Sequence, residues 1–267
     1  MPQVFTRPRL AVMTTPHSVA APLVEAPLLN SVLFSSLPTS EELSTLLSAE
    51  FGTGLHKLEQ GYEFEDVHLA VRGIAAKPSA QAEYSFHPVL SGNPHDLNDV
   101  GAHILIGVVE GGDIFDKAQQ FREPRLHQIR LLLRATTALL RASQARAVHL
   151  MNANTTVFPE PFFEAISRDV LSMSAATVWV FPDKDGLHAF TYGLTSAGHP
   201  ELEIADSHAD PTELYYRLVN IADHVLQGAS FKDGDTLAFS ENEKPASISE
   251  TGWFVNAEIP ALNISWA

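Results

Sequence analysis

The chain has 267 residues, no cysteine, and a formal net charge of −15 that comes from 17 Lys or Arg against 32 Asp or Glu. The absence of cysteine excludes disulfides, thiolate metal sites and cysteine nucleophiles. A chain this acidic repels nucleic acid and anionic membrane surfaces, and no apolar run reaches the roughly 20 residues that span a bilayer. We therefore expect neither nucleic acid nor a membrane as a partner.

The beginning of the chain is rich in proline, a residue that fixes φ and donates no backbone hydrogen bond. We expect residues 1–30 to form a proline-rich arm and residues 31–267 to form one domain, with a division into two halves near 95–101 as an open alternative. The apolar stretch after Arg7 and Arg9 is too short for a secretory signal. Together with the missing cysteines, this favours the cytoplasm.

A short apolar strand is expected at 32–34, directly before a helix signal. Residues Thr39-Ser40-Glu41-Glu42 have the form of a capping box, in which the first side chain accepts a backbone N–H and the last reaches back to the cap. A helix should follow to about Phe51. Residues 102–109 are nearly all apolar, which is typical of a central strand covered on both faces. Further strands are expected at 67–74 and 82–86.

The longest helix is expected from about Arg125 to Ala142, with Pro124 dividing it from the residues before it. Its leucines fill a wide arc, as in a helix that lies on a sheet. Three arginines fall together on the opposite side: Arg130, Arg134 and Arg141. The window 122–146 carries a net charge of +5, which leaves −20 for the rest of the chain. A strand at 147–151 and a helix at 161–171 should follow.

The last third begins with a predicted hairpin, 177–181 and 187–192, around Asp185-Gly186. A strand at 201–205 precedes the strongest helix start in the chain, Asp210-Pro211-Thr212-Glu213. Strand pairs that alternate with helices predict the α+β class, a mixed and largely antiparallel sheet with helices packed on it. Short closing strands are expected at 236–239, 253–255 and 262–265.

Alternation along the strand at 201–205 points His199, Glu201 and Glu203 the same way. Two carboxylates about 7 Å apart beside an imidazole can hold a divalent metal or act as acid and base. The competing interpretation is the solvent-exposed face of a half-buried strand. On that interpretation, which we expect, Glu201→Gln and Glu203→Gln each change the stability of the fold by less than about 0.5 kcal/mol.

Two other patterns are open to a metal-binding interpretation. Asp233-Gly234-Asp235-Thr236 has the start of a calcium loop, but Lys244 stands where the closing glutamate should be, so a tight turn is favoured. His87, His95 and His208 lack helical metal-binding spacing, and we interpret them as surface or packed residues. No metal or other cofactor is therefore expected.

The arginine stripe of Arg130, Arg134 and Arg141 could contact phosphates or an acidic patch of a partner. In an acidic protein, we expect instead that these side chains lie outside the core and pair with the chain's own carboxylates. Exposed pairs of this kind contribute only about 0–1 kcal/mol each. The common nucleophile-elbow, phosphate-loop and dinucleotide-binding motifs are absent from the sequence.

One combination of motifs resembles a known family, domain of unknown function 4261. The combination is Thr191-Tyr192-Gly193-Leu194, then Gly198-His199-Pro200-Glu201-Leu202-Glu203-Ile204, then Asp233-Gly234-Asp235-Thr236. The resemblance is clearest over 102–239. It implies an α+β domain of bacterial origin and implies no activity, because the family has no established one. It singles out six signature positions: Tyr192, Gly193, Glu201, Glu203, Gly234 and Asp235.

Two classes of function remain open. The first is a non-enzymatic protein-binding domain, of accessory or inhibitor type, with a basic partner. This class is favoured by the negative charge outside the arginine helix and by the lack of a complete set of catalytic residues. Its candidate functional face is Tyr192, His199, Glu201, Glu203 and Asp235. The second is a metal-dependent hydrolase-like enzyme built on His199, Glu201 and Glu203. The sequence is also compatible with a homo-oligomer.

Overall fold

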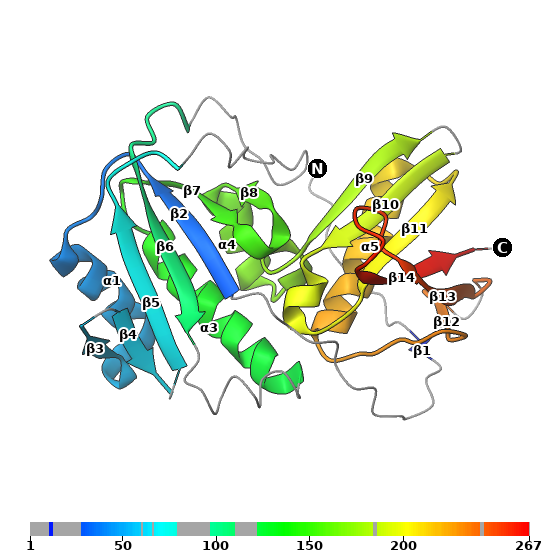
Figure 1. Cartoon of the computed structure of the whole chain (residues 1–267), viewed down its shortest axis with the longest axis horizontal. Coiled ribbons are helices and arrows are strands. Elements are labelled where there is room, and N and C mark those ends of the chain that lie inside the picture. Colours follow the sequence, from blue (N-terminus) through cyan, green and yellow to red (C-terminus); the bar gives the residue numbers. More distant parts are fainter. Residues whose placement is uncertain are drawn as a thin grey trace.

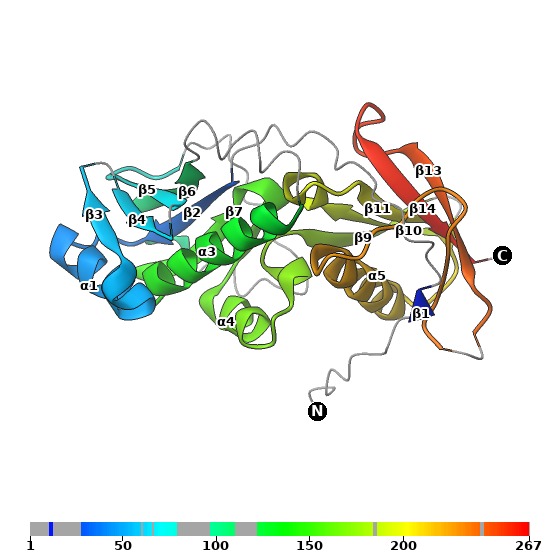
Figure 2. The ribbon, with the colours of Figure 1, turned by 90° about the horizontal axis from the view of Figure 1, so that it is seen from below.

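The computed structural model describes residues 11–12, 28–59, 61–65, 67–78, 97–109, 122–183, 186–240 and 243–266. These residues form two seven-stranded sheets that lie side by side and are mostly antiparallel (Figure 1). The long helices lie on one side of the sheets (Figure 2). The α+β class expected from the sequence is confirmed.

The first sheet has the strand order β3-β4-β5-β6-β2-β7-β8. The apolar strand at its centre is β6, where Ile104 and Ile106 are fully buried, as the sequence predicts. The strands are β2 (Leu28–Phe34), β3 (His56–Leu58), β4 (Gly61–Phe64), β5 (Val67–Ile74), β6 (Ala102–Val109), β7 (Ala145–Leu150) and β8 (Thr155–Val157).

Two helices pack on this sheet, α1 (Ser40–Phe51) and α3 (Arg122–Leu140). The capping box is formed: Glu42 N donates to Thr39 Oγ1 over 3.2 Å, and Thr39 N donates to Glu42 Oε2 over 2.7 Å. The prediction that Pro124 divides the long helix from the residues before it is wrong. Pro124 lies in the first turn of α3, where backbone N–H groups have no acceptor within the helix.

The second sheet has the order β1-β12-β13-β14-β11-β10-β9, and α5 (Pro211–Leu226) packs on it. Asp210 caps α5 through its Oδ1, which accepts from Thr212 N and Glu213 N. The pair β11–β14 is parallel, and the other described strand pairs of this sheet are antiparallel. The strands are β1 (Ala11–Val12), β9 (Thr177–Asp183), β10 (Gly186–Tyr192), β11 (Glu201–Ser207), β12 (Thr236–Ala238), β13 (Ala246–Gly252) and β14 (Pro260–Ser265).

The prediction of a strand at 253–255 is wrong. These residues form a loop between β13 and β14, and the strand that precedes them, 246–252, was missed. Only Ala246 and Ile248 of β13 are buried, so its apolar alternation is too short to identify a strand. Farther back, the helix expected at 161–171 is α4 (Pro159–Ser167) followed by a separate short 3₁₀ turn. The strand predicted at 82–86 lies outside the described residues.

One cluster of buried hydrophobic side chains includes residues of both sheets. Apart from β1, which pairs with β12, the strands up to β8 belong to the first sheet and those from β9 onward belong to the second. Residues 97–101, the described part of the interval 95–101, lead into β6 of the first sheet. Within the described part of the chain, no helix is long and apolar enough to cross a bilayer.

Candidate functional site

Glu201, at the start of β11, is 1% exposed, so the expectation of a solvent-exposed strand face is wrong. Its Oε1 accepts hydrogen bonds from Gly193 N at 3.0 Å, Thr195 N at 3.1 Å and Thr195 Oγ1 at 3.0 Å. Its Oε2 accepts from Thr191 Oγ1 at 2.7 Å. A buried carboxylate is tolerated only when its lone pairs are satisfied, and here four hydrogen bonds satisfy them. The side chain is therefore committed to the turn 193–198.

Hydrogen bonds from this turn of the second sheet reach the elements of the first sheet. Ser196 O accepts from Arg125 Nε of α3 at 2.7 Å, and Ser196 Oγ accepts from Asn152 Nδ2 at 3.1 Å. Asn152 Oδ1 in turn accepts from Leu29 N at the start of β2, at 2.9 Å. Gly193 has φ +113°, and a Cβ there would lie 3.0 Å from Asn152 O, so a larger residue is excluded on both counts.

His199 directly follows this turn and is buried, with its backbone N–H donating to Leu194 O at 3.1 Å. Asp235 lies in a different turn, before β12. Its Oδ2 accepts from Lys232 N at 3.0 Å, and Gly234 beside it has φ +82°. The Asp-Gly segment is therefore a tight turn, as favoured from the sequence. Of the five predicted residues, the structure gathers Tyr192, Glu201 and Glu203 on neighbouring strands and leaves His199 and Asp235 in turns.

Glu203 is also buried, at 6% exposed, but in different surroundings. It lies between Phe190 of β10 and Asn263 of β14 in the sheet register. Its Oε2 accepts from Phe254 N at 3.0 Å and lies 3.9 Å from His188 Nε2. Burial raises the pKa of the Glu203 carboxyl above its usual range, and the Phe254 hydrogen bond and His188 offset only part of that effect.

Aromatic rings enclose this carboxylate. The loop 253–259 crosses in front of β10, and α5 lies behind the same strands (Figure 1). The Phe254 ring lies 4.3 Å from the His188 ring and 5.0 Å from the Phe181 ring, centroid to centroid. Trp253 packs on Phe190 and on Tyr192. We call these residues the aromatic face: Phe181, His188, Phe190, Tyr192, Trp253 and Phe254.

Three buried polar atoms at this face have no hydrogen-bond partner among the described residues: His188 Nε2, Trp253 Nε1 and Asn263 Oδ1. Leaving a buried polar group unpaired costs about 1–3 kcal/mol. We did not predict these residues from the sequence. The available signal is the alternation along β10, which places His188, Phe190 and Tyr192 on one face and Leu187, Ala189 and Thr191 on the other.

The arginine stripe is occupied by intramolecular pairs. Arg130 Nη1 lies 2.7 Å from Asp169 Oδ1, and Arg141 Nη1 lies 2.8 Å from Glu50 Oε2. Arg134 donates to both the carboxylate and the carbonyl of Glu50, and its guanidinium lies 4.5 Å from the centre of the Phe51 ring. The charges of the stripe are therefore largely balanced within the first sheet and its helices.

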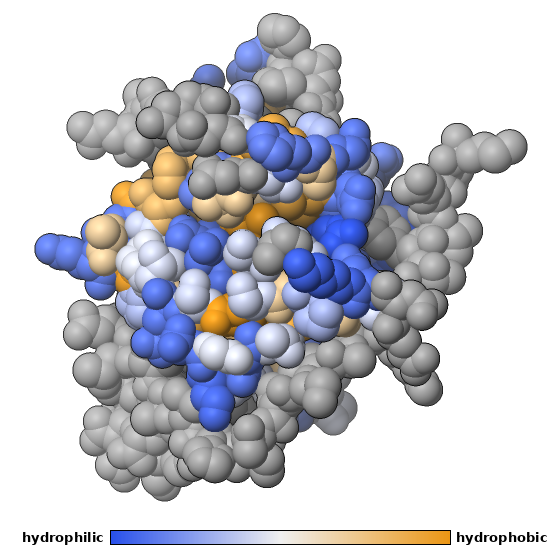
Figure 3. Space-filling model, turned by 90° about the vertical axis from the view of Figure 1, so that its right-hand side faces the viewer, coloured by the Kyte–Doolittle hydropathy of each residue, from blue (hydrophilic) through white to orange (hydrophobic). Residues whose placement is uncertain are grey.

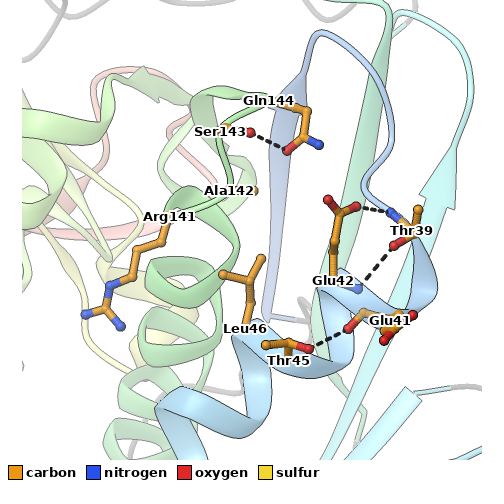
Figure 4. A pocket seen from close by; sticks show the side chains of 9 residues that line it. All are labelled: Thr39, Glu41, Glu42, Thr45, Leu46, Arg141, Ala142, Ser143 and Gln144. Atoms are coloured by element: carbon orange, nitrogen blue, oxygen red, sulfur yellow. Dashed lines mark hydrogen bonds between the residues drawn. The ribbon is translucent and has the colours of Figure 1, made fainter.

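Two surface hollows lie elsewhere. One, of about 510 Å³, lies between the start of α1 and the end of α3, where Glu42 is bonded to Thr39 and Arg141 points away (Figure 4). The other, of about 580 Å³, lies between β11, β14 and α5, where Arg217 is paired with Glu213 and Glu243. Because their main charged groups already have partners, we do not place the site in either hollow.

No three His, Asp or Glu side chains gather closely enough to hold a metal ion in the described part of the chain. His208 is exposed just before α5, while His87 and His95 lie outside the described residues. The geometry therefore offers one concentrated group of unusual side chains, the aromatic face with Glu203 beneath it.

Residues 190–264 match the family described as Domain of unknown function (DUF4261). The resemblance inferred from the sequence is confirmed over this segment, which begins and ends later than the expected 102–239. The segment contains β11, the loop 253–259 and most of β14, and it excludes the first sheet. Comparison with curated proteins and with solved structures finds no match.

The two glutamates should respond differently to loss of charge. We expect Glu201→Gln to lower the free energy of unfolding by about 2–4 kcal/mol, because an amide cannot accept all four hydrogen bonds and turns donors toward donors. Glu203→Gln keeps an acceptor for Phe254 N. It should leave the free energy of unfolding at pH 7 unchanged or raise it by up to about 1 kcal/mol, because a neutral amide escapes the cost of burying a charge.

The stability effect of Glu203→Gln should depend on pH in a defined direction. A carboxyl whose pKa is raised in the folded state contributes stability at low pH, and that contribution is lost as the pH rises from the unfolded pKa through the folded one. Any gain from Glu203→Gln should therefore disappear below about pH 4, where both side chains are neutral. Urea unfolding at several pH values measures this, and a gain that persists in acid would contradict the assignment.

The stripe gives a second prediction. Arg134→Gln should lower the free energy of unfolding by about 1–2 kcal/mol, more than the sequence suggested, because the guanidinium also packs over Phe51. Arg141→Gln is the matched control, since Arg141 pairs with the same Glu50 but is exposed, and it should cost no more than about 1 kcal/mol. Equal losses in denaturant unfolding would show that the ring contact contributes nothing.

Proposed function

We propose that this protein is a non-enzymatic protein-binding domain, of accessory or inhibitor type, that docks a basic protein through the loop 253–259. The observation that carries the proposal is the tip of this loop, where Phe254 is 50% and Val255 is 49% exposed. Seen from the end that carries the second sheet, hydrophobic side chains reach the surface mainly in the upper part of the view, with a smaller group below, among hydrophilic ones (Figure 3). Exposed aromatic side chains in a polar surround are typical of interaction sites.

The charge around the loop favours a basic partner. Residues 177–266 hold four Lys or Arg against 14 Asp or Glu, a net charge of −10 out of −15 for the whole chain. Glu250 and Glu258, on either side of the exposed tip, are themselves exposed. Such a field speeds the approach of a basic protein and repels acidic ones, including a second copy of this chain. The missing cysteines support a cytoplasmic location for the encounter.

The alternative, a metal-dependent hydrolase, needs Glu201 and His199 as ligands. Both oxygens of Glu201 already accept hydrogen bonds, and removing them would open the turn that joins the sheets. We find no observation in the described residues that favours this chemistry, and so we do not propose it.

The test is capture of a partner from the natural host at low salt, followed by binding measurements with both purified proteins. We expect a basic protein whose affinity falls steeply as salt is added. Phe254→Ser should weaken binding by about tenfold or more, as for an aromatic anchor. Leu58→Ser is the matched control, because Leu58 is an exposed hydrophobic residue of the first sheet, and it should bind normally. Recovery of no basic protein, or equal binding by both variants, would overturn the proposal.

A further inference from the structure

The aromatic face lies beside two acceptor groups that no described donor fully serves. The Oε1 atom of Glu203 accepts no hydrogen bond from the described residues, and Oε2 accepts only one. Asn263 Oδ1, next to Glu203 in the register of the parallel pair, is buried without a partner. His188 Nε2 is also buried without a hydrogen-bond partner, and it lies 3.9 Å from Glu203 Oε2. Both Glu203 and His188 are more than nine-tenths buried.

The surroundings of these acceptors suit one kind of chemical group. The Glu203 carboxylate would repel an anion. A neutral group would leave the negative charge of Glu203 without compensation in a poorly hydrated environment. A cation balances the charge, and it is also attracted by the faces of the rings of Phe190, Trp253 and Phe254. Among protein cations, the planar guanidinium has five N–H donors that can serve several acceptors together, whereas an ammonium is a compact point charge that is strongly hydrated.

We propose that Glu203, Asn263 and the aromatic face form a receptor for an arginine side chain of the basic partner. This inference rests on the proposed function and names the group that the partner inserts. Glu203 would form the charge-assisted hydrogen bonds, and Asn263 Oδ1 would accept from the same fork. Trp253 Nε1, a buried donor without a partner, is available to a backbone carbonyl beside that arginine.

Entry to the receptor is controlled by Phe254, whose half-exposed ring lies over His188. The described hydrogen bond from the loop to this face is Phe254 N to Glu203 Oε2. The loop is braced within itself by Trp253 N to Ile259 O at 2.8 Å and by Ile259 N to Asn256 O at 2.9 Å. Displacement of the Phe254 ring by the arginine would therefore open the way to Glu203, while Trp253 stays packed on Phe190 and Tyr192.

The test uses the whole protein and short peptides of Gly and Ser with one central arginine, citrulline or lysine. Citrulline is the matched control for charge, because it keeps the shape of arginine and loses the cation. We expect the arginine peptide to change the tryptophan fluorescence of the protein and the amide NMR signals of Trp253, Phe254 and their neighbours. Binding of the citrulline and lysine peptides should be weaker by about tenfold or more.

Two variants locate the site. Glu203→Gln should abolish binding of the arginine peptide, while Glu258→Gln, an exposed carboxylate on the same loop, should leave it nearly unchanged. If Glu203→Gln does not fold, Asn263→Ala gives a second test of the same fork and should weaken binding. Equal binding of citrulline or lysine, spectral changes that map away from the loop, or loss of binding in Glu258→Gln would overturn the receptor. Those results would leave the docking of a basic partner standing, because that proposal is tested with the captured protein.

Discussion

The four hydrogen bonds to the buried carboxylate of Glu201 hold the rest of the structure in place. They fix the turn 193–198 after β10, and this turn presents Ser196 to both Arg125 and Asn152. Arg125 lies on the long helix of the first sheet, and Asn152 bonds to the first residues of β2. One carboxylate on the second sheet therefore orders the contacts that join it to the first. The low dielectric constant of the interior strengthens such a network when it is complete and makes it costly when it is broken.

The same strand carries a second carboxylate with the opposite character. Glu201 and Glu203 are two residues apart on β11, but one is surrounded by N–H and O–H donors and the other by aromatic rings. Burial raises the pKa of Glu203, which means that the free fold bears a cost in keeping this group ionised. A ligand that balances the charge of Glu203 would remove this free-energy cost, and sites that carry such a cost are often functional. For this reason we assign structure to Glu201 and recognition to Glu203.

Much of the fold could be predicted from local signals. The capping box at Thr39, the Asp210-Pro211 helix start and the turn at Asp233-Gly234 depend on residues a few positions apart, and the structure has all three. The strand β13, third in the order of the second sheet, was missed because only two of its side chains are buried. The loop with Trp253 was mistaken for a strand because three apolar residues in a row look the same whether they pair or fold over a sheet.

The candidate site was predictable only in part, for a related reason. The sequence placed Glu201 and Glu203 on one side of a strand, which is correct, but alternation does not say whether that side faces water. Burial of Glu203 comes from a loop some 50 positions away, through Phe254 and the register of β14. Burial of Glu201 comes from a turn that packs against Asn152, which lies some 50 positions away, between two strands of the first sheet. Such long-range contacts leave no periodic trace in the sequence.

Hydrogen exchange of the Gly193 and Thr195 amides tests most directly whether Glu201 holds the joint between the sheets. Both amides donate to a buried carboxylate, so we predict that in the native protein they exchange as slowly as the paired amides of β10 and β11. In Glu201→Gln, both should exchange much faster, while the amides of β5 and β6 in the first sheet stay protected. Exchange of Gly193 and Thr195 in the native protein at the rate of the exposed residues 254–258 would contradict the account.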